Sequence, residues 1–187
     1  MGYTKPARMA IHASSAGGLV AGVMANTRPD LFAAMVMKAP FLSVLGAMQD
    51  SSLPLTVHEF EEWGDPRKGG RKVEEYLRSY SPYENVKPQA YPSMLITGSL
   101  NDNRVNFWDP AKWVARVRKA NTGKSVIMLH MSSDYGHLGT ATVEDSLEDT
   151  ALELAFLEQE LGVSHTAGFK LPFSSRLFNR MSSRHLK

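Results

Sequence analysis

Short apolar segments alternate along the chain with segments of helical periodicity, and this alternation restricts the fold more than any other feature. Strand-like segments occupy 7–12, 33–38, 93–97 and 125–130, and the clearest helical segments are 19–26, 109–117 and 143–161. Apolar strands separated by helices are typical of a parallel sheet with helices on both faces. The sequence therefore predicts an α/β fold, with only weak helical signals between residues 41 and 83.

Two of the expected helices carry recognisable end signals. Asp109 followed by Pro110 is typical of an N-cap with proline at the first helical position. Gly162 is expected to end the last helix. The apolar residues of that helix predict one buried face, formed by Leu147, Ala151, Leu154, Phe156 and Leu157.

The turn after the first strand is the most informative motif. Residues 13–18 read ASSAGG, so a serine stands between an expected strand and an expected helix, as in a nucleophile elbow. With Ser15 at the apex of the turn, the two positions that must hold small residues are Ala13 and Gly17. With Ser14 at the apex, the downstream small position would hold Ala16 instead of a glycine, so Ser15 is preferred. The Ala16 N–H, at the helix start, is expected to donate to an oxyanion. A turn that only packs a strand on a helix is the alternative.

An acid and a histidine follow later strands in the order expected of α/β hydrolases. Asp102 follows the third strand and His137 the fourth, so both should lie with Ser15 at the carboxyl edge of the sheet. The sequence predicts a Ser–His–Asp triad. Asp134 is a competing acid, but it lies in the loop of the histidine itself, and His130 is expected to be structural because it lies inside a strand.

Composition excludes several other classes. The chain has no cysteine, and no apolar run approaches the roughly 20 residues that span a bilayer. No phosphate-binding glycine loop, nucleic-acid module or metal-ligand spacing occurs, so we expect no cofactor, no metal, no nucleic-acid partner and no stable membrane insertion. A cytoplasmic location fits these features.

The charge distribution divides the chain into two parts. All 19 acidic residues lie before residue 165, whereas 165–187 contains only basic charges. We expect one domain over 1–164 and a disordered basic tail over 165–187.

Several ordered blocks together resemble the prolyl oligopeptidase family, and most closely its oligopeptidase B branch. The resemblance covers about residues 2 to 162. The blocks are SAGGL at 15–19, RPDLF at 28–32, PLT at 54–56, EEWGDP at 61–66, SYSPY at 79–83 and WDPAKW at 108–113.

The resemblance implies a function and a set of site residues. Members are similar in having an α/β-hydrolase domain capped by a β-propeller that admits short peptides. By motif, Ser15 corresponds to the nucleophile, Asp102 to the acid and His137 to the base. Glu59 and Glu61 match carboxylates that bind the arginine or lysine before the scissile bond in oligopeptidase B. Two alternate carboxylates can face one pocket and pair with a guanidinium; a solvated acidic loop is the alternative.

The sequence departs from the family pattern in ways that leave other functions open. The upstream residue of the elbow is Ala13 rather than glycine, and the propeller, the first strands and a tyrosine that supplies the second oxyanion donor are not in this sequence. We therefore expect a missing N-terminal region. The alternatives to a peptidase are a prolyl-endopeptidase-like esterase, which shares the PLT and EEWG blocks, and a non-catalytic remnant that acts by binding.

Overall fold

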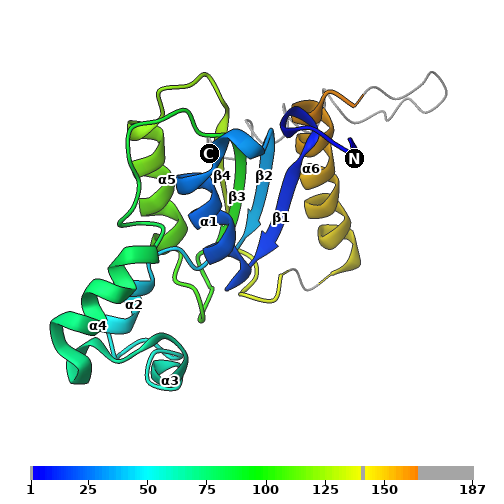
Figure 1. Ribbon diagram of the computed structural model, residues 1–187. Helices are drawn as coiled ribbons and strands as arrows, with labels where there is room; N and C mark the ends of the chain where they lie inside the picture. The colour runs from blue at the N-terminus through cyan, green and yellow to red at the C-terminus, as the bar shows by residue number, and fades with distance from the viewer. Residues whose placement is uncertain (1, 140–141, 164–187) are drawn as a thin grey trace.

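The computed structural model describes residues 2–139 and 142–163, and their core is a four-stranded parallel sheet (Figure 1). The strands lie in chain order: β1 (Ala10–Ser14), β2 (Ala34–Lys38), β3 (Ser93–Ser99) and β4 (Ile127–Ser132). Every neighbouring pair is parallel, so the four carboxyl ends meet at one edge of the sheet. The predicted α/β fold is confirmed.

The expected strands are all present, with shifted boundaries. β1 begins at Ala10 instead of residue 7, because Pro6–Arg8 forms a 3-10 turn (η1) in which proline fixes φ. β4 is likewise displaced toward the C-terminus from the expected 125–130. Ser14 of β1 pairs with Lys38 of β2, and Lys38 pairs with Thr97 of β3, so these strands end at about the same level.

Helices cover both faces of the sheet (Figure 1). On one face α1 (Gly17–Thr27) packs against β1 and β2, and α5 (Trp108–Ala120) packs against β3 and β4. On the other face α6 (Val143–Leu161) packs against β2 and β3. A 3-10 turn, η2 (Pro29–Leu31), follows α1 and leads the chain back to β2.

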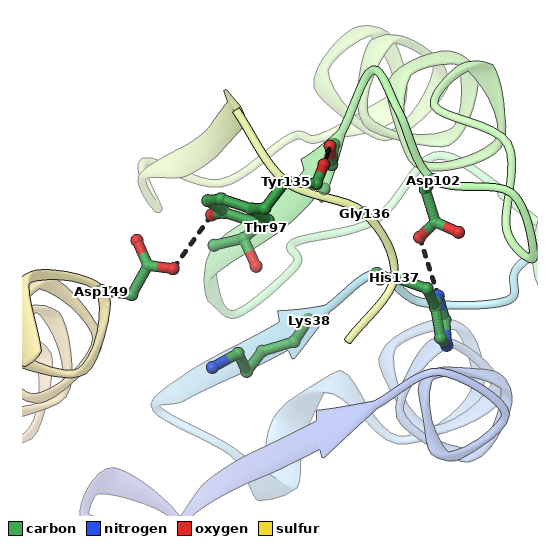
Figure 2. Close-up of a pocket in the computed structure, with 10 residues that line it drawn as sticks. Lys38, Thr97, Asp102, Tyr135, Gly136, His137 and Asp149 are labelled. Atoms are coloured by element: carbon green, nitrogen blue, oxygen red, sulfur yellow. Dashed lines mark hydrogen bonds and ion pairs between the residues drawn. The ribbon is translucent and has the colours of Figure 1, made fainter. Parts of the chain in front are cut away.

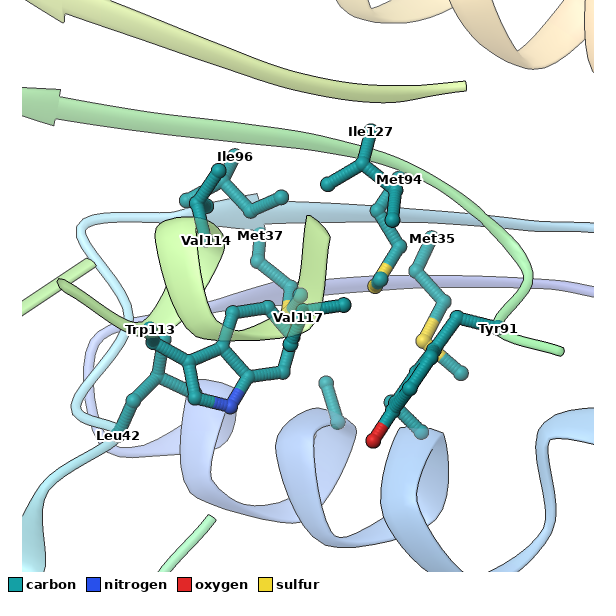
Figure 3. Packing of buried hydrophobic residues seen from close by; sticks show 12 residues of the cluster. Met35, Met37, Leu42, Tyr91, Met94, Ile96, Trp113, Val114, Val117 and Ile127 are labelled. Carbon is teal, nitrogen blue, oxygen red and sulfur yellow. The ribbon is translucent and has the colours of Figure 1, made fainter. Parts of the chain in front are cut away.

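The central strands are buried on both sides, which explains their continuous apolar character. In β2, Met35 and Met37 face the helices α1 and α5, whereas Val36 lies in a second cluster with Phe156 of α6. Figure 3 shows Trp113 of α5 packed in the first cluster, together with the two methionines. Successive side chains of a strand point to opposite faces, so a single strand serves both cores.

The expected buried face of α6 is partly wrong. Phe156 is buried, but Leu147 is 64% exposed and Leu154 is 55% exposed. The inward face instead includes the carboxylates of Asp149 and Glu153, which bind groups on the sheet side. The spacing of apolar residues could not predict this face, because two of its inward-facing residues are acidic. The end of the helix at Gly162 is as expected, with φ 62°.

The expected cap at the start of α5 is also wrong. The helix begins at Trp108, so Asp109 lies inside its first turn, where it is buried. Its Oδ2 accepts hydrogen bonds from the backbone N–H groups of Leu42 (3.1 Å) and Ser43 (3.3 Å). The carboxylate therefore binds a distant loop instead of capping its own helix.

A helical excursion connects β2 to β3. It contains α2 (Val44–Gln49), α3 (Phe60–Trp63) and α4 (Pro66–Tyr80), and α4 is interrupted at Gly70, where φ is 57°. Residues from α2 and α4 form a third apolar cluster. Figure 1 shows these helices extending away from the sheet.

Two features are absent from residues 2–139 and 142–163. None of the helices there combines the length and apolarity that crossing a membrane requires. No group of three or more His, Asp or Glu side chains in these residues is arranged to hold a metal ion. The expected basic tail at 165–187 lies outside the described residues.

Candidate active site

The turn after β1 places Ser15 in a conformation that is rare for residues with a side chain. Its φ is 50°, in the left-handed region. The Ser15 N–H donates to Lys38 O (2.9 Å), and the Ser15 carbonyl accepts from Gly18 N–H (2.9 Å) and Phe41 N–H (3.0 Å). These three backbone bonds hold the turn in its strained conformation.

The close packing of this turn depends on Gly18 more than on Gly17. A Cβ at Gly18 would lie 2.3 Å from Pro40 Cβ and 2.6 Å from Pro40 Cα, whereas one at Gly17 would lie 3.9 Å from Ala13 Cβ. The sequence motif placed the small positions at Ala13 and Gly17, whereas the closest approach in the structure is at Gly18. The loop after β2, which the sequence motif does not contain, sets this constraint, and an alanine at position 13 fits.

The helix α1 begins directly after the turn that contains Ser15. Ala16 is the residue that precedes its first turn, and it is exposed. Among the described residues, the Ala16 N–H donates to no protein acceptor. A free N–H at the positive end of a helix is suited to bind a developing negative charge.

Asp102 lies in the loop after β3 with its carboxylate almost fully buried, at 1% side-chain exposure. Its Oδ1 accepts hydrogen bonds from the backbone N–H groups of Arg104 (2.8 Å) and Val105 (2.9 Å). Its Oδ2 lies 2.7 Å from His137 Nδ1. Each carboxylate oxygen thus has a donor, and the side chain is held in one orientation.

His137, in the loop after β4, joins Asp102 to Ser15. Its Nδ1 contacts Asp102 Oδ2, as Figure 2 shows, and its Nε2 lies 2.9 Å from Ser15 Oγ. With Nδ1–H donating to the carboxylate, Nε2 is the acceptor for the serine hydroxyl. The structure therefore brings together the three residues that the sequence singled out, from three different loops.

The competing residues lie elsewhere. Asp134 accepts from its neighbour Ser133 (3.0 Å) and is exposed. Ser14 belongs to β1, before the turn. His130 lies inside β4, and no hydrogen bond or ion pair joins it to the three residues of the candidate triad.

The two predicted specificity carboxylates are not joined to this arrangement. Glu59 Oε2 accepts from the indole Nε1 of Trp63 (3.0 Å), and Glu61 is exposed on α3. Because Glu61 is in a helix, its side chain does not share a direction with one two positions away, as it would in a strand. Neither carboxylate lines the cavity beside His137.

That cavity reveals polar groups that the sequence did not indicate. It has a volume of about 40 Å³, and Asp102 and His137 line it together with Lys38, Tyr135 and Asp149 (Figure 2). The phenol of Tyr135 donates to Asp149 Oδ2 (2.9 Å). Burial raises the pKa of Tyr135 to about 12, and Asp149 contributes to the same shift. No local motif connects these residues, because they meet only when α6 packs on the sheet.

A second polar cluster lies on the same face of the sheet. Glu153 of α6 is buried, and its carboxylate contacts His12 Nε2 (2.8 Å) on β1 and Lys38 Nζ (2.9 Å) on β2. These contacts hold α6 against β1, which leads into the Ser15 turn, and β2, which leads into the neighbouring loop.

The fold and the site together define a class of protein. A parallel sheet with a serine at a strained turn after one strand, and an acid and a histidine after later strands, is the arrangement of the α/β-hydrolase fold. Within that class, the chain belongs to the prolyl oligopeptidase family, whose model matches residues 1–164.

Individual relatives agree with this assignment. Protease 2 of Moraxella lacunata is 43% identical over 161 residues, which are 86% of this chain and 23% of that protein. The prolyl endopeptidase-like protein of Homo sapiens is 37% identical over 175 residues, 90% of this chain and 24% of that protein.

A solved structure shows the same likeness. Oligopeptidase B from Trypanosoma brucei with covalently bound antipain matches with a TM-score of 0.84 and 38% identity, over 89% of this chain and 23% of that one. The chain spans about a quarter of the length of these relatives.

Proposed function

We propose that Ser15, His137 and Asp102 form the catalytic triad of a serine peptidase that cleaves short peptides after arginine or lysine. The observation that carries the proposal is the continuous hydrogen-bonded path from Ser15 Oγ through the imidazole to Asp102, with distances of 2.9 and 2.7 Å. The left-handed turn at Ser15 adds support, because strained conformations of this kind concentrate at functional sites.

The geometry supports acyl transfer in two stages. Ser15 Oγ attacks the peptide carbonyl carbon while His137 Nε2 takes the hydroxyl proton, and Asp102 stabilises the resulting imidazolium. The protonated imidazole then gives that proton to the leaving amine as the C–N bond breaks. This leaves an acyl-enzyme ester on Ser15.

Hydrolysis of the ester repeats the sequence with water. His137 takes a proton from the attacking water, and the same proton returns to Ser15 Oγ when the acyl group leaves as a carboxylic acid. In each stage the carbonyl oxygen becomes negative, and the unpartnered Ala16 N–H is suited to donate to it. The proposed reaction uses side chains and water and needs no metal or cofactor.

The preference for a basic residue is supported by the resemblance and by the exposed carboxylate of Glu61 on α3. Glu61 is exposed, and among the described residues it has no ion pair, so its carboxylate is free to bind a guanidinium. Glu59 keeps one carboxylate oxygen that does not bind Trp63. Because neither residue lines the cavity beside His137, the proposal requires that other parts of the binding site place the basic side chain of the substrate next to Glu59 and Glu61.

An esterase specificity is the second candidate. It is favoured by the 37% identity to the prolyl endopeptidase-like protein and by the absence of Glu59 and Glu61 from the cavity beside the triad. Arginyl amide and thioester substrates separate the two specificities. A clear preference for the arginyl amide would exclude this candidate.

Completion of the site by a further segment is also part of the proposal. β1 is the edge strand of the sheet, so one side of its backbone pairs with no strand among the described residues. The relatives are about four times as long as the chain. We infer that an N-terminal region pairs with this edge and supplies the second oxyanion donor.

The first test is covalent labelling of the 187-residue chain with a fluorophosphonate, followed by peptide mass spectrometry. We expect an adduct on Ser15, formed with loss of fluoride, and none in Ser15→Ala. Ser14→Ala is the matched control, because it removes the neighbouring hydroxyl and leaves the triad, and it should be labelled like the wild type. A labelled Ser15→Ala protein would contradict the assignment, and a folded but unlabelled wild type would favour a non-catalytic role.

A second test addresses specificity. We expect Glu61→Gln to lower kcat/KM for an arginyl amide about tenfold or more, with little change for a substrate that has an uncharged residue before the scissile bond, because a charge-assisted hydrogen bond is lost. Glu62→Gln is the control, since that carboxylate is exposed on the same short helix. Equal loss for both substrates would argue against a guanidinium-binding role.

A further inference from the structure

The loop that carries His137 is attached to the protein through Tyr135. Two positions before the histidine, the Tyr135 carbonyl accepts from the hydroxyl of Ser99, and the Tyr135 phenol donates to Asp149 Oδ2 (2.9 Å). One attachment comes from the end of β3, and the other comes from α6. Figure 2 shows the bond between Tyr135 and Asp149 and, separately, the Asp102–His137 pair.

These attachments matter because, directly after His137, the described chain is held by one local backbone bond, from Gly139 N–H to Gly136 O (3.2 Å). Leu138 is 87% exposed, and Gly139 has a positive φ of 94°. The Tyr135–Asp149 bond links residues 14 positions apart and so closes the segment that contains the histidine. Closing a segment of this length restricts the conformations available to it.

The phenol is suited to act as a permanent donor. Burial raises the pKa of Tyr135 to about 12, so the hydroxyl stays protonated at neutral pH. Its acceptor is a carboxylate on the half-buried inner side of α6. Hydrogen bonds to charged partners are shorter and stronger than neutral ones.

We propose that Tyr135 is a positioning residue for His137, held by Asp149 and Ser99 so that the imidazole spans the distance between Asp102 and Ser15. Its catalytic consequence rests on the proposed function, whereas its effect on the His137–Asp102 hydrogen bond does not. The chain thereby uses α6, which contributes no member of the triad, to set the place of the base.

Rates of fluorophosphonate labelling provide the first test. Tyr135→Phe removes the hydroxyl and keeps the ring, and we expect the maximal labelling rate to fall about tenfold, with little change in the concentration of probe that gives half the maximal rate. Asp149→Ala should have the same effect, and Asp149→Asn should recover most of the rate, because its amide oxygen can still accept the phenol O–H. Glu148→Ala is the control on the exposed side of α6.

A double-mutant cycle and a spectroscopic signal distinguish positioning from general stability. Tyr135→Phe and Asp149→Ala combined should lower the rate no further than either alone. In proton NMR, the downfield resonance of the His137–Asp102 hydrogen bond should broaden through solvent exchange in Tyr135→Phe and remain sharp in Glu148→Ala, at temperatures well below unfolding.

The outcomes separate the two proposals. If wild-type protein is not labelled, the proposed catalysis fails, and the NMR comparison still decides the role of Tyr135. An unchanged resonance in Tyr135→Phe, or additive effects in the double mutant, would overturn the positioning role. A broadened resonance together with rescue by Asp149→Asn would establish it.

Discussion

At the scale of single residues, the site depends on one serine in a left-handed conformation and on the space around its turn. The φ of 50° at Ser15 is held by backbone bonds to Lys38, Gly18 and Phe41. Gly18 permits this arrangement, because any side chain there would meet the backbone of Pro40. The strained conformation of Ser15, the proposed nucleophile, is therefore maintained by the loop after β2.

Two neighbouring glycines give a matched prediction at this scale. Gly18→Ala should lower the free energy of unfolding by about 1–3 kcal/mol and slow labelling of Ser15, because the new Cβ would lie 2.3 Å from Pro40 Cβ. Gly17→Ala should be within about 0.5 kcal/mol of wild type, since its Cβ would lie 3.9 Å from Ala13. Urea unfolding and labelling rates check both variants. Similar losses in the two would show that the close approach at Gly18 is not the constraint.

At the scale of elements, α5 holds the loop that packs on the turn containing Ser15. Asp109 binds the backbone of Leu42 and Ser43, directly after Phe41, whose N–H donates to Ser15 O. Burial raises the pKa of Asp109 to about 6, while Lys112 and the two backbone bonds oppose this and Glu84 adds to it. The Oδ1 atom of Asp109 is buried without a hydrogen-bond partner, which fits a carboxyl that ionises with difficulty.

This buried carboxyl predicts a pH dependence of stability. Because its folded-state pKa of about 6 exceeds the ordinary 3.8, the folded protein binds the additional proton between about pH 4 and 6. Its contribution to the free energy of unfolding is therefore fully present below about pH 4 and is lost as the pH rises through 6, by about 3 kcal/mol at most.

Asp109→Asn tests this dependence. The variant cannot ionise at this position, so its stability relative to wild type should improve by up to about 3 kcal/mol between pH 4 and 7. Urea unfolding at the two pH values measures the difference. A difference between wild type and variant that stays constant with pH would contradict the ionisation of Asp109.

At the scale of the whole molecule, β1 forms one edge of the sheet, and no strand within residues 2–139 and 142–163 pairs with its outer side. The strand is only partly buried along its length, and α6 lies over β2 and β3. The apolar residues Leu147 and Leu154 of α6 are also exposed. An open strand edge and exposed apolar side chains each favour association with another segment or another copy of the chain.

The open edge leads to a prediction about association. Ala10 is exposed at the start of β1, and a charge there should oppose edge-to-edge pairing. We expect Ala10→Lys to reduce concentration-dependent light scattering of the isolated chain while the far-UV circular dichroism stays the same. Ala7→Lys, outside the strand, is the control. Equal scattering of wild type and Ala10→Lys would show that association does not use this edge.

The sequence by itself determined the fold class and the three residues Ser15, Asp102 and His137. The fold class follows because buried parallel strands require continuous apolar runs and helices require a different period, and both periods can be counted along the chain. The three residues of the proposed triad could be singled out because each follows a strand, and parallel strands bring their carboxyl ends to one edge.

Only the tertiary structure decided the contacts between segments that are distant in sequence. Asp109 looked like a helix cap and instead binds a loop some 66 positions away, and the inner face of α6 holds Asp149 where apolar spacing had favoured Leu147. The support of His137 by Tyr135 has no local signal either. Such contacts form when helices pack on the sheet, so their chemistry depends on three-dimensional proximity, which the order of residues along the chain does not specify.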